Sequence, residues 1–189
     1  MKYIIEHMEK RLYKWCFLEY QHISSIVGKE NLVFTNLNKS QAEKLKPFGE
    51  CYTKSIKDLP EIGFTNMCVL DPEADKTLSA EDAKVFDFLI FGGILGDNPP
   101  RKRTKEELIL EGLERRNIGE EQFPTDNAVY VCKQIIDGKS MDELKFQDEV
   151  EIDIAPGESV IMPFRYVLVD GKPLILPELL EYIKTHKGF

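Results

Sequence analysis

A repeating order of apolar strand and helix constrains the fold of this chain more than any other feature of its sequence. Such an order places parallel strands side by side and packs the connecting helices against the sheet. The sequence therefore predicts an α/β fold with a mostly parallel sheet and helices on both faces. The predicted strands are residues 3–7, 31–34, 67–70 and 85–91, with a further short extended segment at 118–123.

The helices between these strands have typical start and stop signals. Hydroxyl, carboxylate and amide side chains satisfy the free N–H groups of a first turn, and glycine is common just after a last turn. The predicted helices, with the residues expected to cap or end them, are 14–27 (Gly28), 41–45 (Ser40), 104–116 (Thr104 and Glu107) and 127–137 (Asp126 and Gly138), and a short helical turn begins at Ser79.

The C-terminal quarter of the chain has a different pattern. Apolar residues alternate with acidic ones over 150–154, which is typical of a half-buried strand. A second strand is predicted over 159–169 and a closing helix over 177–184. Because no linker-like tract separates this part from the rest, we expect a single domain, 1–189, with a C-terminal strand and helix appendage from about residue 148.

The charge of the chain narrows the class of partner. With 33 acidic against 25 basic residues, the formal net charge is −8. Nucleic-acid binding depends on clustered Lys and Arg side chains. The acidic balance therefore argues against a broad phosphate-binding face and favours a basic protein as partner.

The cysteines and the opening segment indicate a cytoplasmic protein. Cys16, Cys51, Cys68 and Cys132 are widely spaced and form no CxxC pair, which is typical of reduced thiols in an intracellular protein. The opening segment, MKYIIEHMEKRLYKW, contains no uninterrupted apolar stretch. We therefore expect neither a signal peptide nor a membrane span.

Three loops that follow apolar segments are the candidates for a ligand site, at residues 70–72, 91–97 and 122–127. Loops after parallel strands gather at the carboxyl edge of the sheet, where ligands bind, and small residues there leave room for a purine and a ribose. A glycine-rich turn without a ligand is the alternative. The G-x-G-x-x-G pattern of dinucleotide sites and the complete P-loop pattern G-x-x-x-x-G-K-S/T are both absent.

Four ordered segments carry a resemblance to a known family. KYIIEHME, FLIFGGILGDNPPRKRT, QFPTDNAVYVCK and MPFRYVLVDGKPLILPE together resemble the SPOUT-class methyltransferases once described as predicted RNA methyltransferases. The yeast-type members, which the chain resembles most, are protein arginine N-methyltransferases that act on a small-subunit ribosomal protein. The resemblance implies S-adenosylmethionine as cofactor, bound in a C-terminal trefoil knot, a feature that sequence periodicity does not reveal.

The resemblance also assigns the three loops to the cofactor. The residues expected to bind S-adenosylmethionine are Leu70, Asp71, Pro72, Phe91, Gly92, Gly93, Ile94, Gly96, Asp97, Gln122, Phe123, Thr125, Asn127 and Ala128.

An arginine acceptor sets the chemistry that the rest of the site must supply. A guanidinium has a pKa above about 12 and a delocalised lone pair, so it is a poor nucleophile. Carboxylates that bind it bidentately orient one nitrogen, and alignment of acceptor, methyl and sulfur supplies roughly 7–11 kcal/mol of the barrier. The candidate catalytic residues are Asp97, Glu6, Glu19, Arg101 and Arg165, and no metal site is predicted.

Asp97 is the first of these candidates, because the glycine-rich loop is expected to bring it to the cofactor. Each candidate also has a plain structural interpretation. Asp97 is suited to bonding the amides of its own turn, Glu19 to a solvated helix face, and Arg101 to an exposed surface. Arg165 lies in an otherwise apolar strand and needs an acidic partner, a role that suits a carboxylate of the site.

These observations favour an S-adenosylmethionine-dependent methyltransferase with a protein arginine as acceptor. One alternative is a SPOUT enzyme that methylates rRNA or tRNA, and another is a non-catalytic, ribosome-associated binding module. The net charge favours protein over RNA. A monomer and a dimer formed through the knot are both compatible with the sequence.

Overall fold

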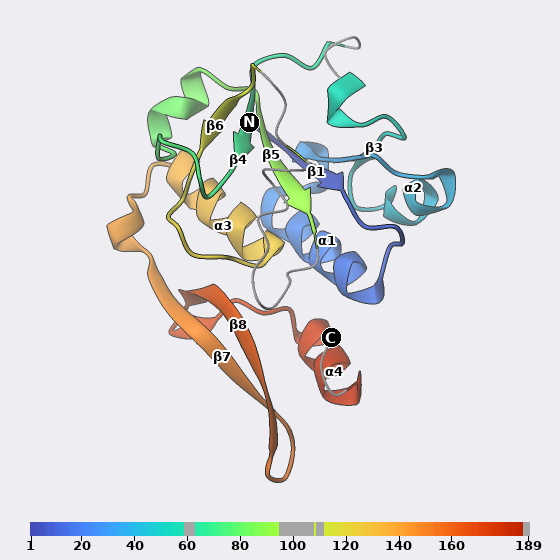
Figure 1. The fold of residues 1–189 in the computed structure, drawn as a ribbon, viewed down its shortest axis with the longest axis vertical. Helices are drawn as coiled ribbons and strands as arrows, with labels where there is room; N and C mark the ends of the chain where they lie inside the picture. Colours follow the sequence, from blue (N-terminus) through green and yellow to red (C-terminus); the bar gives the residue numbers. More distant parts are fainter. Residues whose placement is uncertain (59–62, 95–107, 109–111, 187–189) are drawn as a thin grey trace.

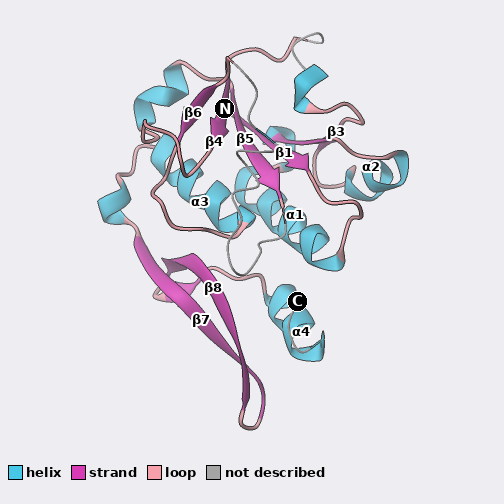
Figure 2. Ribbon diagram, viewed as in Figure 1, coloured by secondary structure: helices cyan, strands magenta, loops and turns pink. Residues whose placement is uncertain are grey.

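The computed structural model describes residues 1–58, 63–94, 108 and 112–186. A six-stranded parallel sheet, in the order β3-β2-β1-β5-β4-β6, forms the body of the molecule, and a three-stranded antiparallel sheet lies below it (Figures 1 and 2). The elements are β1 (Lys2–His7), α1 (Lys14–Val27), β2 (Leu32–Thr35), α2 (Lys39–Leu45), β3 (Glu50–Cys51), β4 (Met67–Leu70), β5 (Phe88–Gly93), β6 (Glu114–Arg116), α3 (Thr125–Ile136), β7 (Lys145–Ala155), β8 (Glu158–Val169), β9 (Lys172–Pro173) and α4 (Pro177–His186).

The parallel sheet buries apolar side chains on both of its faces. Successive residues of a strand point to opposite faces, so Ile5 and the other buried side chains on its face share one core with α1 and α3. These two helices lie side by side. Ile4 points to the other face, where Ile56, Phe64 and Leu108 cover the sheet. The predicted α/β class and the mostly parallel sheet are confirmed.

The direction of the strand order changes between β1 and β5. From β1 the chain moves outward through β2 to β3, whereas β5 and β4 lie on the other side of β1. At such a point a crevice opens outside the carboxyl ends of the strands, and ligands of open α/β sheets bind there. β1 ends at His7 and β5 ends at Gly93, and these two residues are register partners.

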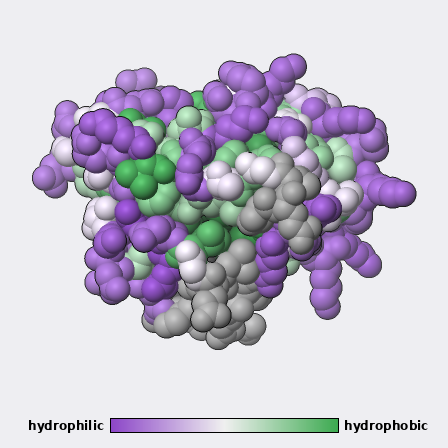
Figure 3. Space-filling view, turned by 90° about the horizontal axis from the view of Figure 1, so that it is seen from above, coloured by the Kyte–Doolittle hydropathy of each residue, from purple (hydrophilic) through white to green (hydrophobic). Residues whose placement is uncertain are grey.

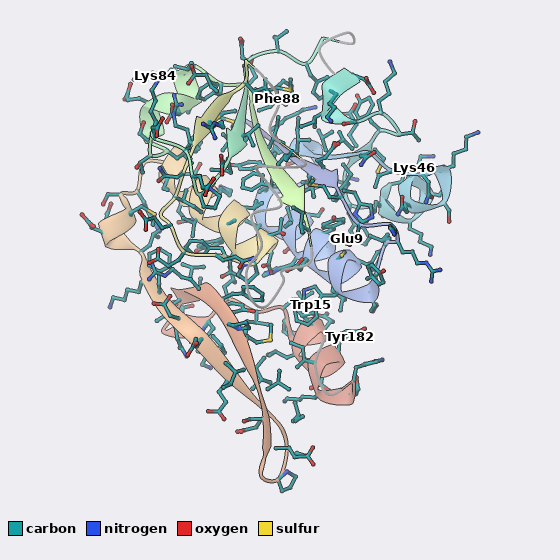
Figure 4. The ribbon with its side chains drawn as sticks, viewed as in Figure 1. Glu9, Trp15, Lys46, Lys84, Phe88 and Tyr182 are labelled. Carbon is teal, nitrogen blue, oxygen red and sulfur yellow. The ribbon has the colours of Figure 1, made fainter. Side chains whose placement is uncertain are left out.

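The C-terminal sheet packs on α1 instead of joining the parallel sheet. β7 and β8 form a long hairpin that projects away from the body (Figure 1). Its buried side chains share a core with Trp15 and Leu18 of α1 and with α4. Trp15 and Tyr182 lie close together in Figure 4, with their rings edge to face and their centroids 6.5 Å apart. α1 is therefore one of the elements that join the two sheets.

Most predicted elements are present, with shifted ends. β4 and α1 match their predicted ranges. β5 begins at Phe88 rather than at residue 85, and Val85 is 61% exposed. The predicted helix 104–116 is wrong at its end, because Glu114–Arg116 forms β6, an edge strand that pairs with β4. Thr104 and Glu107 lie outside the described residues.

Two predicted helix caps have different roles from those expected. Asn38, rather than Ser40, caps α2, through a reciprocal pair of hydrogen bonds with Gln41. α3 begins at Thr125 without a side-chain cap, so Asp126 lies inside its first turn and not before it. The short turn predicted at Ser79 is confirmed as a 3-10 helix, Ala80–Lys84, and residues 118–123 form no strand.

The surface is mostly hydrophilic, although hydrophobic residues gather in the middle of the face seen in Figure 3. None of the helices in the described part of the chain combines the length and the apolar character needed to span a bilayer. All four cysteines are free thiols. Burial raises the pKa of Cys16 and Cys68 to about 12, so both thiols stay protonated at neutral pH.

Candidate functional site

The first predicted loop, at residues 70–72, is held by internal contacts. Asp71 is 2% exposed. One of its carboxylate oxygens accepts a hydrogen bond from Arg115 at 2.7 Å, and the other accepts from the backbone N–H of Glu73 at 3.0 Å. Leu70 is buried and Pro72 is exposed. The carboxylate of Asp71 therefore fixes the turn after β4, and its role toward a cofactor remains a prediction.

The glycine pair after β5 fits closely against neighbouring side chains. A Cβ on Gly93 would lie 2.1 Å from the hydroxyl oxygen of Tyr20, and a Cβ on Gly92 would lie 3.0 Å from the Ile94 side chain. Phe91, just before them, is buried. Close packing within the fold thus already requires glycine at position 93, independently of any ligand.

The third loop, at residues 122–127, connects the parallel sheet with the hairpin. The carbonyl of Gln122 accepts a hydrogen bond from the backbone N–H of Arg165 at 2.9 Å. The Asn127 side chain donates to the carbonyl of Leu174 at 2.9 Å and accepts from the N–H of Val167 at 3.0 Å. Asn127 therefore ties α3 to β8, a structural role that the sequence did not indicate.

One atom of this third loop has the property expected of a ligand contact. The side-chain oxygen Oε1 of Gln122 is buried and has no hydrogen-bond donor within the described ranges. A buried acceptor of this kind costs free energy unless a donor reaches it. In the same loop and just after it, Phe123 contacts Phe146 edge to face, Thr125 is buried and Ala128 is half-buried.

A cluster of ionisable side chains lies between α1, the start of α3 and β8. Glu19 and Asp126 are 5% and 2% exposed, and His22 contacts Asp126 with 2.7 Å between Nδ1 and Oδ2. Burial and the nearby Asp126 raise the pKa of Glu19 well above its usual value, while a hydrogen bond from Trp15 works against this shift. Burial, with Asp126 and Glu19 nearby, also raises the pKa of Tyr166.

Among the described residues, no arginine or lysine balances the charge of this cluster. Within the described residues, neither Glu19 nor Asp126 forms an ion pair with such a side chain, and His22 is the only basic partner. The alternative interpretation of Glu19, as a charge on a solvated helix face, is therefore wrong. Sequence reasoning also missed His22 and the buried position of Asp126, although the i, i+3 spacing of Glu19 and His22 places them on one side of α1.

The remaining candidates fall into three situations. Glu6 is buried and accepts hydrogen bonds from the hydroxyls of Thr35 and Ser55, at 2.5 and 2.6 Å, and from the N–H of Ile56 at 3.1 Å. These donors give Glu6 a structural role at the end of β1. Asp97, Gly96 and Arg101 lie outside the described residues.

Arg165 has the acidic partners that the sequence required, but on the surface. Its guanidinium binds Asp148 through two hydrogen bonds of 2.6 and 3.0 Å and lies 3.2 Å from Glu121. It also lies over the ring of Phe146. The partners therefore come from β7 and from the residue before the third loop, and not from the buried cluster. Groups of three possible metal ligands are absent from the described part of the chain.

Known proteins resemble this chain over almost its whole length. Protein arginine N-methyltransferase SFM1 of Saccharomyces cerevisiae is 41% identical over 201 aligned residues, which cover 97% of this chain and 94% of that protein. The crystal structure of the yeast enzyme complexed with S-adenosylmethionine superposes with a TM-score of 0.87, covering 98% of this chain and 90% of the other. A dual-specific Trm10 of Thermococcus kodakaraensis, 24% identical with a TM-score of 0.56 over 76% of this chain and 96% of its own, shares the fold.

The fold, the site and these relatives define the class as S-adenosylmethionine-dependent methyltransferases, and the predicted class is confirmed. The family described as Protein arginine N-methyltransferase SFM1-like matches residues 2–188. The chain belongs to this family.

Proposed function

We propose that this protein transfers a methyl group from S-adenosylmethionine to an arginine side chain of a small-subunit ribosomal protein. Membership of the SFM1-like family and the named activity of the yeast relative support a protein arginine as acceptor. The ribosomal substrate rests on the resemblance of the four sequence segments. The net charge of −8 suits a basic protein better than RNA.

The proposed place of the cofactor is the three loops at the carboxyl edge of the sheet. When bound, S-adenosylmethionine supplies an electrophilic methyl group on a sulfonium. We assign its binding to residues 70–72, 91–97 and 122–127, as the resemblance implies, with Gln122 as a side-chain acceptor for an amino group. The unpartnered Oε1 of Gln122 supports this assignment, because a donor from a ligand would satisfy it.

The observation that carries the arginine acceptor is the buried pair of carboxylates, Glu19 and Asp126. Among the described residues, the only basic side chain paired with these two buried acids is His22, which contacts Asp126, so the acids attract a further cation. A planar guanidinium suits carboxylates especially well. A carboxyl with a raised pKa also takes up a proton readily. We therefore assign to Glu19 the orientation of the guanidinium and the uptake of the proton released on methylation.

The other candidates complete this proposal. Asp97 and Arg101 follow the glycine pair in sequence, and Asp97 is proposed as a second carboxylate for the acceptor. Arg165 is proposed to support the third loop through its backbone contact with Gln122, and Glu6 to fix the end of β1. The trefoil knot and a cytoplasmic location are parts of the same proposal, and it applies equally to a monomer and a dimer.

The deciding experiment is transfer of labelled methyl groups from S-adenosylmethionine into fractionated ribosomal components. We expect label in a protein of the small subunit, recovered as methylarginine after hydrolysis. Label in rRNA or tRNA would contradict the proposed acceptor. A thermal-shift measurement provides the control, since a ligand that binds the native state raises its melting temperature. No shift at saturating S-adenosylmethionine would instead favour a non-catalytic binding module.

A further inference from the structure

The transfer reaction makes no use of a group of buried polar side chains at the carboxyl end of β1. His7 and Tyr20 are each 1% exposed, and Gln41 is 7% exposed. They come from β1, α1 and α2. His7 lies beside Gly93, its register partner in β5, so the group borders the crevice where the strand order changes direction. These three residues are called the His7 group below.

The hydrogen bonds of the His7 group have one consistent direction. The Oε1 of Gln41 accepts the backbone N–H of Asn38 at 2.7 Å, which leaves its amide nitrogen for the ring of His7. That nitrogen lies 3.1 Å from His7 Nε2 and only donates, so Nε2 must accept. The ring proton is thereby assigned to Nδ1, which donates to the hydroxyl of Tyr20 at 2.9 Å.

The hydroxyl of Tyr20 then faces Gly93. Because it accepts from His7, its own proton is directed to another acceptor, and the carbonyl of Gly93 lies 3.5 Å away. The same carbonyl accepts the N–H of Met8 at 3.2 Å. The Tyr20 hydroxyl also fills the space that a Cβ on Gly93 would need, at 2.1 Å. Tyr20 therefore meets the last residue of β5 both through a polar contact and through close packing.

We propose that Tyr20 is a positioning residue for cofactor binding. Its hydroxyl, oriented by His7 and Gln41, fixes Gly93 and so sets the place at which residues 91–94 meet S-adenosylmethionine. This inference rests on the proposed function, because it takes the loop after β5 to be a cofactor loop. It assigns no chemical step to Tyr20, which acts only through Gly93.

The hydroxyl is separable from the packing of the Tyr20 ring. The ring contacts Phe34, with 5.3 Å between centroids, and phenylalanine at position 20 would keep that contact. Burial raises the pKa of Tyr20 well above its usual value, so the hydroxyl stays protonated. Tyr20→Phe therefore removes the polar contact at Gly93, together with the acceptor of the His7 Nδ1–H, and leaves the packing of the ring in place.

The test measures the dissociation constant of S-adenosylmethionine by calorimetry, together with kcat and KM for methyl transfer. For Tyr20→Phe we expect binding weaker by about three- to tenfold, the size expected for loss of one hydrogen bond, with kcat nearly unchanged. Tyr3→Phe is the matched control, because Tyr3 is a buried tyrosine of the same core, 4% exposed, with its ring stacked on Phe91. It is expected to bind like the wild type.

The outcomes separate this inference from the proposed function. Equal dissociation constants for the wild type and Tyr20→Phe would overturn the positioning role, and so would equal weakening by Tyr20→Phe and Tyr3→Phe. Failure of the wild type itself to bind S-adenosylmethionine would overturn the proposed function instead.

A second pair of variants tests the contact from the side of Gly93. Gly93→Ala is expected to weaken cofactor binding more than Tyr20→Phe does, because its Cβ meets the hydroxyl. In the double variant the clash with the hydroxyl is gone, so the two effects should be less than multiplicative. Multiplicative effects would show that Tyr20 and Gly93 act independently and would contradict the proposal. Circular dichroism and the melting temperature check that each variant is folded.

Discussion

Two regions of this molecule bury carboxylates, and they neutralise them differently. At the edge of the parallel sheet, Asp71 is paired with Arg115 at 2.7 Å and Asp82 with Arg116 at 3.0 Å. Between α1 and α3, Asp126 is paired with His22, and Glu19 forms no ion pair with a basic side chain among the described residues. The difference has an energetic consequence, because an isolated buried charge is costly.

The difference indicates which acids hold the fold together and which are available to a ligand. A carboxylate that already has a guanidinium has little to gain from a second one. Arg116 in addition lies over the ring of Phe86 and contacts Glu114, so its position is fixed by three neighbours. Within the described part of the chain, the pair at α1 and α3 lacks such a cation, and the proposed acceptor arginine would supply it.

The largest expected effect is on catalysis at Glu19. Glu19→Gln keeps the size of the side chain and removes its charge and its ability to take up a proton. We expect methyl transfer to fall by more than about a hundredfold, the range typical of a lost acid–base group, while the free energy of unfolding does not fall. Initial rates at saturating cofactor and urea unfolding measure the two quantities. Near-normal turnover would remove Glu19 from the acceptor site.

The matched variant in the other region is expected to behave in the opposite way. Asp82→Asn leaves the buried guanidinium of Arg116 without its main partner. The free energy of unfolding should fall by about 3 kcal/mol, the low end for a broken buried pair, because Glu114 still contacts Arg116. The rate per folded molecule should stay within about twofold of the wild type. A stable but inactive Asp82→Asn protein would break the distinction between the two regions.

A smaller effect is expected for Asp126→Asn. The amide retains an acceptor for the backbone N–H of Asn127, which Asp126 now binds at 2.8 Å, but it loses the charged contact with His22. We expect the free energy of unfolding to fall by about 1–2 kcal/mol, as for a hydrogen bond to a charged group. Urea unfolding at pH 7 measures this loss. No loss at all would mean that the His22 contact contributes nothing to stability.

The smallest expected effect is on the pH dependence of stability, and it sharpens the comparison between the two regions. The raised pKa of Glu19 means that its contribution to stability is fully present below the unfolded value of 4.5 and is lost as pH rises through the folded value. Glu19→Gln lacks this loss, so its advantage in unfolding free energy over the wild type should grow from pH 5 to pH 7. An advantage that stays constant with pH would contradict the raised pKa.

His7 gives the free energy of unfolding the opposite dependence on pH, and the wild type and Glu19→Gln share this dependence. Burial lowers the pKa of His7, against smaller effects of Glu9 and the Arg11 carbonyl that raise it. Its contribution to stability is therefore present above about 6.5 and lost as pH falls. Because Glu19→Gln leaves His7 intact, the contribution of His7 to stability cancels when the unfolding free energies of the two proteins are subtracted.

Much of the fold was predictable from local patterns. The apolar run of β4 and the helical spacing of α1 each identified an element over its whole length. β6 was assigned to a helix because three charged residues, Glu114–Arg116, carry no strand pattern. Their strand conformation comes from pairing with β4, and long-range pairing outweighs local preference at a sheet edge.

The loops of the candidate site follow from the sequence and stay a prediction, whereas its buried charges could not be predicted. The resemblance identified the residues expected around the cofactor, and the parallel topology supports the carboxyl edge as the place where ligands bind. Glu19 was a candidate, yet its burial was not expected. Asp126 was interpreted as a helix cap, because an acid before an apolar helix usually is one. Its partner His22 is 104 residues away in sequence, and such pairings carry no local signal.

The sequence by itself determined the α/β class, the family and the cofactor, because strand and helix periodicity and ordered motifs are local properties of the chain. Only the tertiary structure decided which acids are paired with arginine and which are buried without one, and why Gly93 must be glycine. Those properties depend on residues brought together from distant parts of the chain, where burial and a neighbour's position determine the free energy of a charge or of a single added methyl group.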